Sequence, residues 1–202
     1  QKNILDNIQI FKGVKPQGEI TQEGLMIDYF RDYDLNIILD NSQTTECPII
    51  VETNPTFSNL FGNIERVNDG KGNWYSDFTN IKAGSLLKAN GGYLVLNVMH
   101  LFEEPGVWKT LKRVLTYNKL EIRESPYLLS MASTTLKPQP IDIDTKVILI
   151  GNQLVYAYLA EREYDFKKMF KVKADFDYEI DRKNNILNEY VRVIKKLIKQ
   201  EN

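Results

Sequence analysis

The residue types that most often do chemistry are scarce in this chain, and their placement excludes several mechanisms. His100 is the only histidine and Cys47 the only cysteine among 202 residues. No Ser/His/Asp or Cys/His set can be built without His100, and we expect this histidine, on a strand-to-helix turn, to be structural rather than catalytic. The acidic residues lack metal-ligand spacing, and no G-x-x-x-x-G-K-[ST] loop occurs. We therefore predict no catalytic residue, no bound metal and no phosphate cradle within this chain.

The most informative stretch is residues 91–101, GGYLVLNVMHL. Two glycines introduce a strand that ends in Asn97 and Val98, where a nucleotide hydrolase carries its metal-binding acid. Asn152 follows the predicted strand 147–150 in the same way. A polar side chain at the carboxyl end of a strand is where open α/β sheets bind ligands. A Gly-Asn pair after a strand is also a common turn, so two interpretations of Asn152 stay open.

The composition indicates a globular domain without a broad charge field. Hydrophobic residues make up 43% of the chain and aromatic residues 11%, which is enough for a core. The 26 basic and 27 acidic residues nearly cancel, so we expect neither nucleic-acid nor membrane partners. A single cysteine fits a reducing compartment, and we predict a cytoplasmic protein. No apolar run approaches the roughly 20 residues that span a bilayer, and no signal-peptide pattern occurs.

Short runs rich in Ile, Val and Leu predict strands that are buried on both faces. The predicted strands are residues 35–39, 48–51, 93–98, 147–150 and 170–172. Helix patterns occur after Pro105, where Trp108 and Leu111 share a face, then within 154–170 and within 186–198. This alternation predicts an α/β fold, a three-layer α/β sandwich with a mostly parallel sheet.

Two segments interrupt the alternation. Residues 59–82 contain three glycines, few aliphatic residues and the adjacent aromatic residues Trp74 and Tyr75, which predicts a long functional loop or hairpin. Trp74 either lies exposed in a binding loop or packs beneath its own loop, since exposed aromatic residues are uncommon without a partner. Residues 119–143 predict a β-hairpin or meander inserted before the strand 147–150.

Several runs, taken in order, resemble the ATPase-side region of Lon-like ATP-dependent proteases, in the subfamily with a long insertion in its AAA+ module. These runs are DNSQTTECPIIVE, TNPTFSNLFGNIE, DFTNIKAGSLLKANGGYLVLN, KVILIGN and FKVKADFD. The resemblance implies a core of the AAA+ or P-loop NTPase type at residues 30–181. It also implies the end of a helical insertion and a linker at 1–29, and a helix at 182–202 that leads towards a lid domain. We expect the chain to be part of a longer protein, whose phosphate loop and Ser-Lys peptidase domain lie outside it.

The resemblance gives roles to individual residues. The strand 93–98 matches the Walker B strand, in which an Asp holds Mg²⁺ through water and a Glu polarises the attacking water. Asn97 stands at the Asp position and Val98 at the Glu position, where Asn is a weak Mg²⁺ partner and Val cannot act as a base. Asn152 matches the sensor-1 residue that contacts the γ-phosphate. ATP and Mg²⁺ are thus the family's cofactors, whereas we expect none bound by this chain and impaired ATP hydrolysis.

Two further sites follow from the resemblance. An arginine finger is expected just before FKVKADFD, but Lys167 and Lys168 stand there, and Arg162 lies farther upstream. Lysine provides a point charge without the bidentate fork of arginine, so we expect Lys168 to stabilise a neighbour's phosphate poorly. Trp74 and Tyr75 fall in the segment that faces the central pore of AAA+ rings, which makes them candidates for gripping the substrate.

The resemblance implies unfolded polypeptide substrates, a homo-oligomeric ring and a full-length protein that is an ATP-dependent serine endopeptidase. Two alternatives stay open. One is the AAA+ module of an enhancer-binding transcription activator, which shares runs like NLFGNIE, KANGGYLVLN and LKRVL. The other is a non-enzymatic scaffold that keeps only the AAA+ shape. Enhancer-binding activators carry a Gly-Ala-Phe-Thr-Gly-Ala loop and an Asp-Glu pair, and this sequence has neither. The Lon-like family is therefore favoured over the first alternative.

Overall fold

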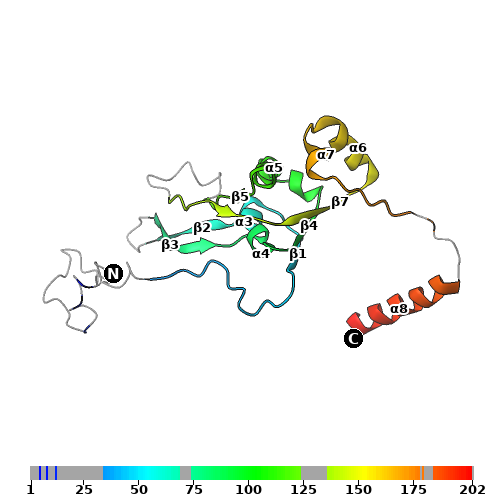
Figure 1. Ribbon diagram of the computed structural model, residues 1–202, viewed down its shortest axis with the longest axis horizontal. Helices are drawn as coiled ribbons and strands as arrows, with labels where there is room; N and C mark the ends of the chain where they lie inside the picture. Colours follow the sequence, from blue (N-terminus) through cyan, green and yellow to red (C-terminus); the bar gives the residue numbers. More distant parts are fainter. Residues whose placement is uncertain are drawn as a thin grey trace. The chain divides into compact units, whose positions relative to one another are not determined.

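The computed structural model describes residues 34–68, 74–123, 136–177, 179 and 184–201, together with residues 5, 8 and 12. The chain forms two compact units, Gln1–Ala157 and Tyr158–Asn202. The first unit contains the parallel sheet and two antiparallel strand pairs (Figure 1). The predicted helical insertion and linker at residues 1–29 lie outside the described residues, apart from those three positions.

Three parallel strands form the centre of the first unit. The strands β1 (Ile49–Glu52), β4 (Tyr93–Asn97) and β7 (Lys146–Ile150) pair in the order β1-β4-β7. In the register of the sheet, Leu94 lies opposite Ile50 on one side and Val147 on the other. The predicted α/β fold with a mostly parallel sheet is therefore confirmed, and its three central strands lie where the apolar runs predicted them.

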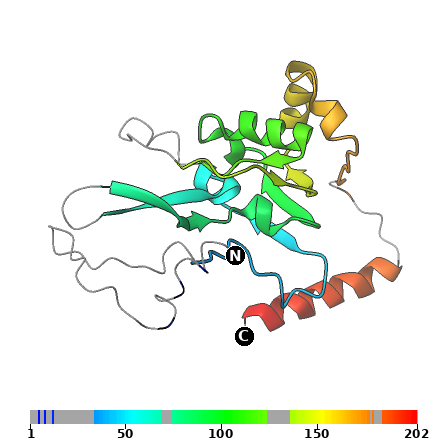
Figure 2. The same cartoon turned by 60° about the vertical axis from the view of Figure 1, so that its left-hand side comes forward.

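One face of this sheet forms the core of the unit. Leu94 and Leu96 are fully buried, and they share a face because side chains alternate along a strand. Helix α5 (Val107–Tyr117) lies beside the sheet (Figures 1 and 2) and buries a stripe with helical spacing, formed by Val107, Trp108, Leu111 and Val114. Each fully buried side chain of this size contributes about 1.5–3 kcal/mol.

The opposite face of the sheet is largely exposed. It carries the alternate positions of the three strands, including Ile49, Val51, Tyr93, Ile148 and Ile150, all of which are exposed. The expected burial on both faces is therefore not met among the residues that the structure describes. A run of Ile and Val residues indicates that a strand is apolar on both faces, but it does not say what covers each face.

Two predicted strands are wrong. Residues 35–39 and 170–172 have irregular backbone and belong to none of the sheets formed by the described residues. Leu35 and Val172 are both exposed. A strand needs a neighbouring strand to pair its N–H and C=O groups, and an apolar run does not supply one.

An antiparallel hairpin of the first unit projects beyond the parallel sheet (Figure 2). In the chain it lies between the short helices α3 (Phe57–Phe61) and α4 (Ser85–Lys88). Its strands are β2 (Asn63–Asn68) and β3 (Trp74–Lys82). Ile64 pairs with Ile81, but Arg66 pairs with Ser76, so residues 77–80 lie opposite Glu65 alone. This irregularity is a bulge, which bends and twists a hairpin. Within the predicted segment 59–82, residues 63–68 and 74–82 are thus the two strands of a hairpin, one of the two predicted possibilities, and residues 69–73 lie outside the described part of the chain.

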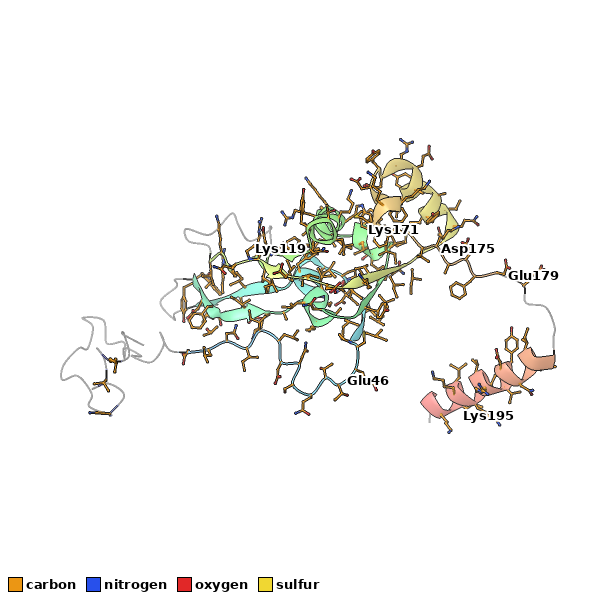
Figure 3. All side chains as sticks on the ribbon, viewed as in Figure 1. Glu46, Lys119, Lys171, Asp175, Glu179 and Lys195 are labelled. Atoms are coloured by element: carbon orange, nitrogen blue, oxygen red, sulfur yellow. The ribbon has the colours of Figure 1, made fainter. Side chains whose placement is uncertain are left out.

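A second antiparallel pair precedes β7. Strands β5 (Lys119–Leu120) and β6 (Ile141–Asp142) pair side by side. Lys119, labelled in Figure 3, forms an ion pair with Asp142 across this pairing. The two ends of the predicted hairpin or meander at 119–143 therefore pair with each other. Its residues 124–135 lie outside the described part of the chain.

The second unit is mostly helical. Helix α6 (Gln153–Arg162) contains the boundary between the units, and α7 (Phe166–Met169) and α8 (Asn184–Glu201) follow. Lys171 and Asp175, labelled in Figure 3, lie on the irregular segment after α7, where Asp175 pairs with Lys173 at 2.8 Å. The predicted helix at 186–198 is confirmed, whereas the pattern at 154–170 divides into α6 and α7. No helix in the described ranges is long and apolar enough to cross a membrane.

Candidate functional site

The carboxyl ends of the three parallel strands bring three polar residues to one edge of the sheet. Glu52 ends β1, Asn97 ends β4, and Asn152 follows the end of β7 by two residues. The register places Glu52 opposite Leu96 and Asn97 opposite Ile150. We call this edge of the sheet the carboxyl edge. Two of the predicted nucleotide-site residues, Asn97 and Asn152, therefore lie at neighbouring strand ends.

The side chain of Asn97 is engaged in its own turn. Its Oδ1 accepts a hydrogen bond of 2.9 Å from the backbone N–H of Met99. This bond directs the chain from β4 into the 3-10 helix η2 (His100–Phe102). An aspartate would accept the same bond, so asparagine keeps the turn and removes the negative charge with which Mg²⁺ is usually bound.

Val98 belongs to the core. Its side chain is only 3% exposed, and its backbone N–H donates to the carbonyl of Ile150 at 2.9 Å. A Cβ atom added at Gly151 would lie 2.5 Å from Cγ1 of Val98, so the valine packs directly against this glycine. Val98 therefore supplies apolar packing between two strand ends and no acid or base.

Asn152 caps helix α6. Its Oδ1 accepts a hydrogen bond of 2.9 Å from the backbone N–H of Val155, as in an N-cap, which typically stabilises a helix by about 1 kcal/mol. The side chain is exposed. The turn interpretation of the sequence thus describes what Asn152 does in the fold, and its contact with a phosphate stays a prediction.

Two carboxylates near the strand ends were not singled out from the sequence. Glu52 accepts hydrogen bonds from the backbone N–H of Asn54 at 2.9 Å and from the hydroxyl of Ser85. Glu104 accepts one from the backbone N–H of Phe57 at 2.9 Å, at the start of α3. Glu52 could have been found, because it follows a predicted strand as Asn97 does. The contact of Glu104 with Phe57 gave no local signal, because the two residues are 47 positions apart.

His100 joins the turn after β4 to the end of β1. Its Nδ1 lies 3.1 Å from the carbonyl oxygen of Thr53, and its Nε2 lies 3.9 Å from Oε1 of Glu103. Both contacts are local and hold neighbouring loops together. The position of His100 is that of a structural histidine.

The carboxyl edge does not fit the Mg²⁺ of a hydrolytic site. Magnesium prefers carboxylate oxygens, and the one carboxylate among the three side chains of the edge, that of Glu52, is already bound by Asn54 and Ser85. Within the described ranges, no three His, Cys, Asp or Glu side chains gather where a metal ion could bind. A polar hollow of about 260 Å³ beside Glu52 is lined by groups of both charges, including Glu65 and Lys82, but not by Asn97, Val98 or Asn152.

The two predicted substrate-binding residues begin β3, near the tip of the hairpin. Trp74 is 64% exposed and Tyr75 is 41% exposed. Tyr75 pairs with Val67 of β2, and adjacent strand residues point to opposite faces. The hairpin therefore presents one aromatic ring on each of its faces rather than two on the same face.

Lys168 belongs to the second unit, whereas the three other predicted nucleotide-site residues belong to the first. Its Nζ lies 3.5 Å from Oδ1 of Asp165 and 4.4 Å from the ring centroid of Tyr164. Arg162 lies in the last turn of α6. The role of Lys168 at an arginine-finger position stays a prediction.

Comparisons with known proteins identify the kind of domain. The crystal structure of NtrX from Brucella abortus is similar at 21% sequence identity over 62% of this chain, with a TM-score of 0.39, and the match covers 25% of the NtrX chain. No curated protein matches the chain. The sequence profile of the family described as "LonB-like, AAA domain" matches residues 45–177, well over half of the chain. The matched range contains the parallel sheet, both antiparallel strand pairs and the carboxyl edge. This chain belongs to the family of LonB-like AAA domains.

Proposed function

We propose that this chain is part of the AAA+ module of a Lon-like ATP-dependent serine protease. In this proposal the module assembles in a homo-oligomeric ring and recognises or translocates unfolded polypeptides towards a Ser-Lys peptidase domain outside this chain. Its own ATP hydrolysis is impaired. Membership of the LonB-like family supports the AAA+ module, and such modules commonly form rings.

The pair Asn97 and Val98 carries the proposal of impaired hydrolysis. Hydrolysis needs an acid that holds the metal and a base within reach of the attacking water. The acid position holds an amide whose oxygen is bound by Met99, and the base position holds a valine packed against Gly151. Neither side chain can supply the missing chemistry by changing its rotamer, because one is neutral and the other has no polar atom.

The hairpin tip supports the proposed contact with substrate. Trp74 and Tyr75 are exposed near the end of a β-ribbon that projects from the sheet (Figure 2). Exposed aromatic rings provide large apolar contact area with few rotatable bonds, which suits sequence-independent contact with an unfolded chain. We further propose a cytoplasmic location and no nucleic-acid or membrane partner, in keeping with the balanced charge.

The main competing function is a non-enzymatic scaffold that keeps only the AAA+ shape, since it too would lack the Walker B acids. The family match favours the Lon-like module over an enhancer-binding activator. A scaffold has no need for an exposed aromatic tip. Substrate contact at Trp74 therefore separates the two functions.

Replacing Trp74 with alanine should lower photo-crosslinking of a labelled unfolded polypeptide to the full-length protein by about tenfold, because truncation of a tryptophan that anchors a contact typically costs more than 1 kcal/mol. Folding should be unaffected, because the side chain is exposed. The measurement is the crosslink yield at fixed polypeptide concentration, together with the thermal unfolding midpoint.

Tyr117→Ala provides a control, since it removes an exposed aromatic side chain on α5. It should leave the crosslink yield unchanged. If Trp74→Ala unfolds the protein, Trp74 is part of the core and the assignment to a pore loop is wrong. If the folded variant crosslinks as well as the unmodified protein, the scaffold is the better function.

A further inference from the structure

The bulge in β3 depends on side chains for its backbone hydrogen bonds. Residues 77–80 lie opposite Glu65 alone, so the regular ladder with β2 is interrupted there. The backbone N–H of Phe78 donates to Oδ1 of Asp77 at 2.5 Å. The carbonyl oxygens of Phe78 and Ile81 both accept hydrogen bonds from the side chain of Asn36. The bulge is thus held partly by a residue far away in the sequence.

Asn36 makes this contact with a single amide group. Its Nδ2 carries two hydrogens and lies 2.8 Å from the carbonyl oxygen of Phe78 and 3.1 Å from that of Ile81. Asn36 is half-buried, whereas its neighbours Leu35 and Ile37 are exposed. Asn36 thus faces the hairpin, whereas the residues on either side of it, Leu35 and Ile37, are exposed.

Asn36 belongs to the strap, the irregular segment of residues 34–47 that leads into β1. Both views show the strap passing beside the hairpin before it reaches the sheet (Figures 1 and 2). The two hydrogen bonds of Asn36 join the strap to β3, between the base of the hairpin and its tip. The strap and the bulge are therefore in direct contact through these two bonds.

The bulge lies between the base of the hairpin and the two aromatic residues near its tip. A bulge fixes the local bend and twist of a hairpin, and Trp74 and Tyr75 lie on its far side, at the start of β3. Without the donors of Asn36, two carbonyl groups would pair with water instead, and the bend would be held less firmly.

We propose that Asn36 is a positioning residue that fixes the direction of the β2–β3 hairpin and so places Trp74 and Tyr75 for contact with polypeptide. It couples the strap to the tip. The proposal rests on the proposed function in one respect, namely that the tip binds unfolded polypeptide.

The test compares Asn36→Leu with Asn41→Leu in the full-length protein. Leucine has the same number of side-chain heavy atoms as asparagine, branched in the same way, but no donor, and Asn41 is an exposed residue of the same strap. Hydrogen exchange of the backbone amides of residues 74–82 should become about tenfold faster in Asn36→Leu, as expected for the loss of two hydrogen bonds, and should not change in Asn41→Leu. Exchange in β1, β4 and β7 should stay the same in both variants.

A binding measurement distinguishes positioning from general stability. In Asn36→Leu, the concentration of unfolded polypeptide that gives half-maximal crosslinking should rise about threefold or more. A loosely held tip loses conformational freedom when it binds, and this loss lowers the affinity. The maximal crosslink yield should be unchanged, and the thermal unfolding midpoint should fall by no more than the few degrees expected for the loss of two hydrogen bonds. Asn36→Gln, which keeps an amide group, should recover part of the lost protection.

Unchanged exchange at residues 74–82 in Asn36→Leu would overturn the proposal. So would faster exchange with normal half-maximal crosslinking, in a protein whose Trp74→Ala variant binds weakly, because the bulge would then not place the tip. If Trp74→Ala itself binds normally, the proposed polypeptide site fails, and the exchange result alone decides whether Asn36 fixes the hairpin.

Discussion

Replacing Val98 with glutamate, the residue of an active Walker B strand, is expected to destabilise the protein by about 2–4 kcal/mol rather than to create an ATPase. Val98 is buried, and it packs against Gly151 at the end of the neighbouring strand. A glutamate there either leaves a carboxylate without a partner in an apolar site or pushes the ends of β4 and β7 apart. Denaturant unfolding of the variant and the unmodified protein measures the difference.

Asn97→Asp is the matched control for this change. It places an acid at the other proposed Walker B position, which is exposed, and aspartate can accept the same hydrogen bond from Met99. We expect its stability to lie within about 0.5 kcal/mol of the unmodified protein. If Val98→Glu is equally stable, its carboxylate reaches water at the carboxyl edge, and the assignment of Val98 to the core is wrong.

Replacing Gly92 with alanine is expected to be the most damaging single-methyl change, at about 3 kcal/mol or more. A Cβ atom at this position would lie 2.0 Å from the carbonyl oxygen of Pro48. That oxygen accepts the hydrogen bond from the N–H of Tyr93 at 2.8 Å, which starts the pairing of β1 with β4. Alanine must therefore separate the two strands where their ladder begins. Thermal or denaturant unfolding measures the loss.

The adjacent Gly91→Ala substitution tests this reasoning. Gly91 has a positive φ of 79° but open space around the position of a Cβ atom, so alanine meets only the cost of a left-handed backbone, about 1–2 kcal/mol. We expect Gly92→Ala to be clearly the more destabilising of the two. An equal loss in both variants would show that β1 and β4 do not approach as closely at Gly92 as the contact with Pro48 requires.

Much of the fold follows from local sequence patterns. The Ile/Val/Leu runs at β1, β4 and β7 and the helical spacing in α5 and α8 are short-range signals, and the structure contains all five elements. Residues 35–39 and 170–172 show the limit of such signals. Their composition is that of strands, but pairing depends on a neighbour that the run itself does not specify.

The candidate site was partly predictable for the same reason. Asn97 and Asn152 were found because polar residues that follow apolar runs are visible locally. The burial of Val98 against Gly151 and the bonds of Asn36 to β3 join residues 42 or more positions apart, and no periodicity reports them. The bulge opposite Glu65 was equally hidden, because alternation along β3 predicts strand character but not its register with β2.

Asn97 and Val98, which we propose to stand at the two Walker B positions, are built into the fold in different ways. Asn97 retains the turn that an aspartate would make, whereas Val98 has become part of the packing between two strands. If hydrolysis is impaired as proposed, restoring it would require more than exchanging two side chains, because core contacts occupy the space around residue 98. This is what the proposed function expects of a module that presents substrate more than it hydrolyses ATP.

Steady-state ATP hydrolysis by the full-length protein, in the presence of an unfolded polypeptide, tests this central claim most directly. We predict phosphate release at the background rate, with no change in Asn152→Ala. Asn152→Ser, which keeps an N-cap for α6, controls for folding. Enzymes usually turn over at about 1 s⁻¹ or faster. ATP turnover in that range would contradict the claim if Asn152→Ala abolished it.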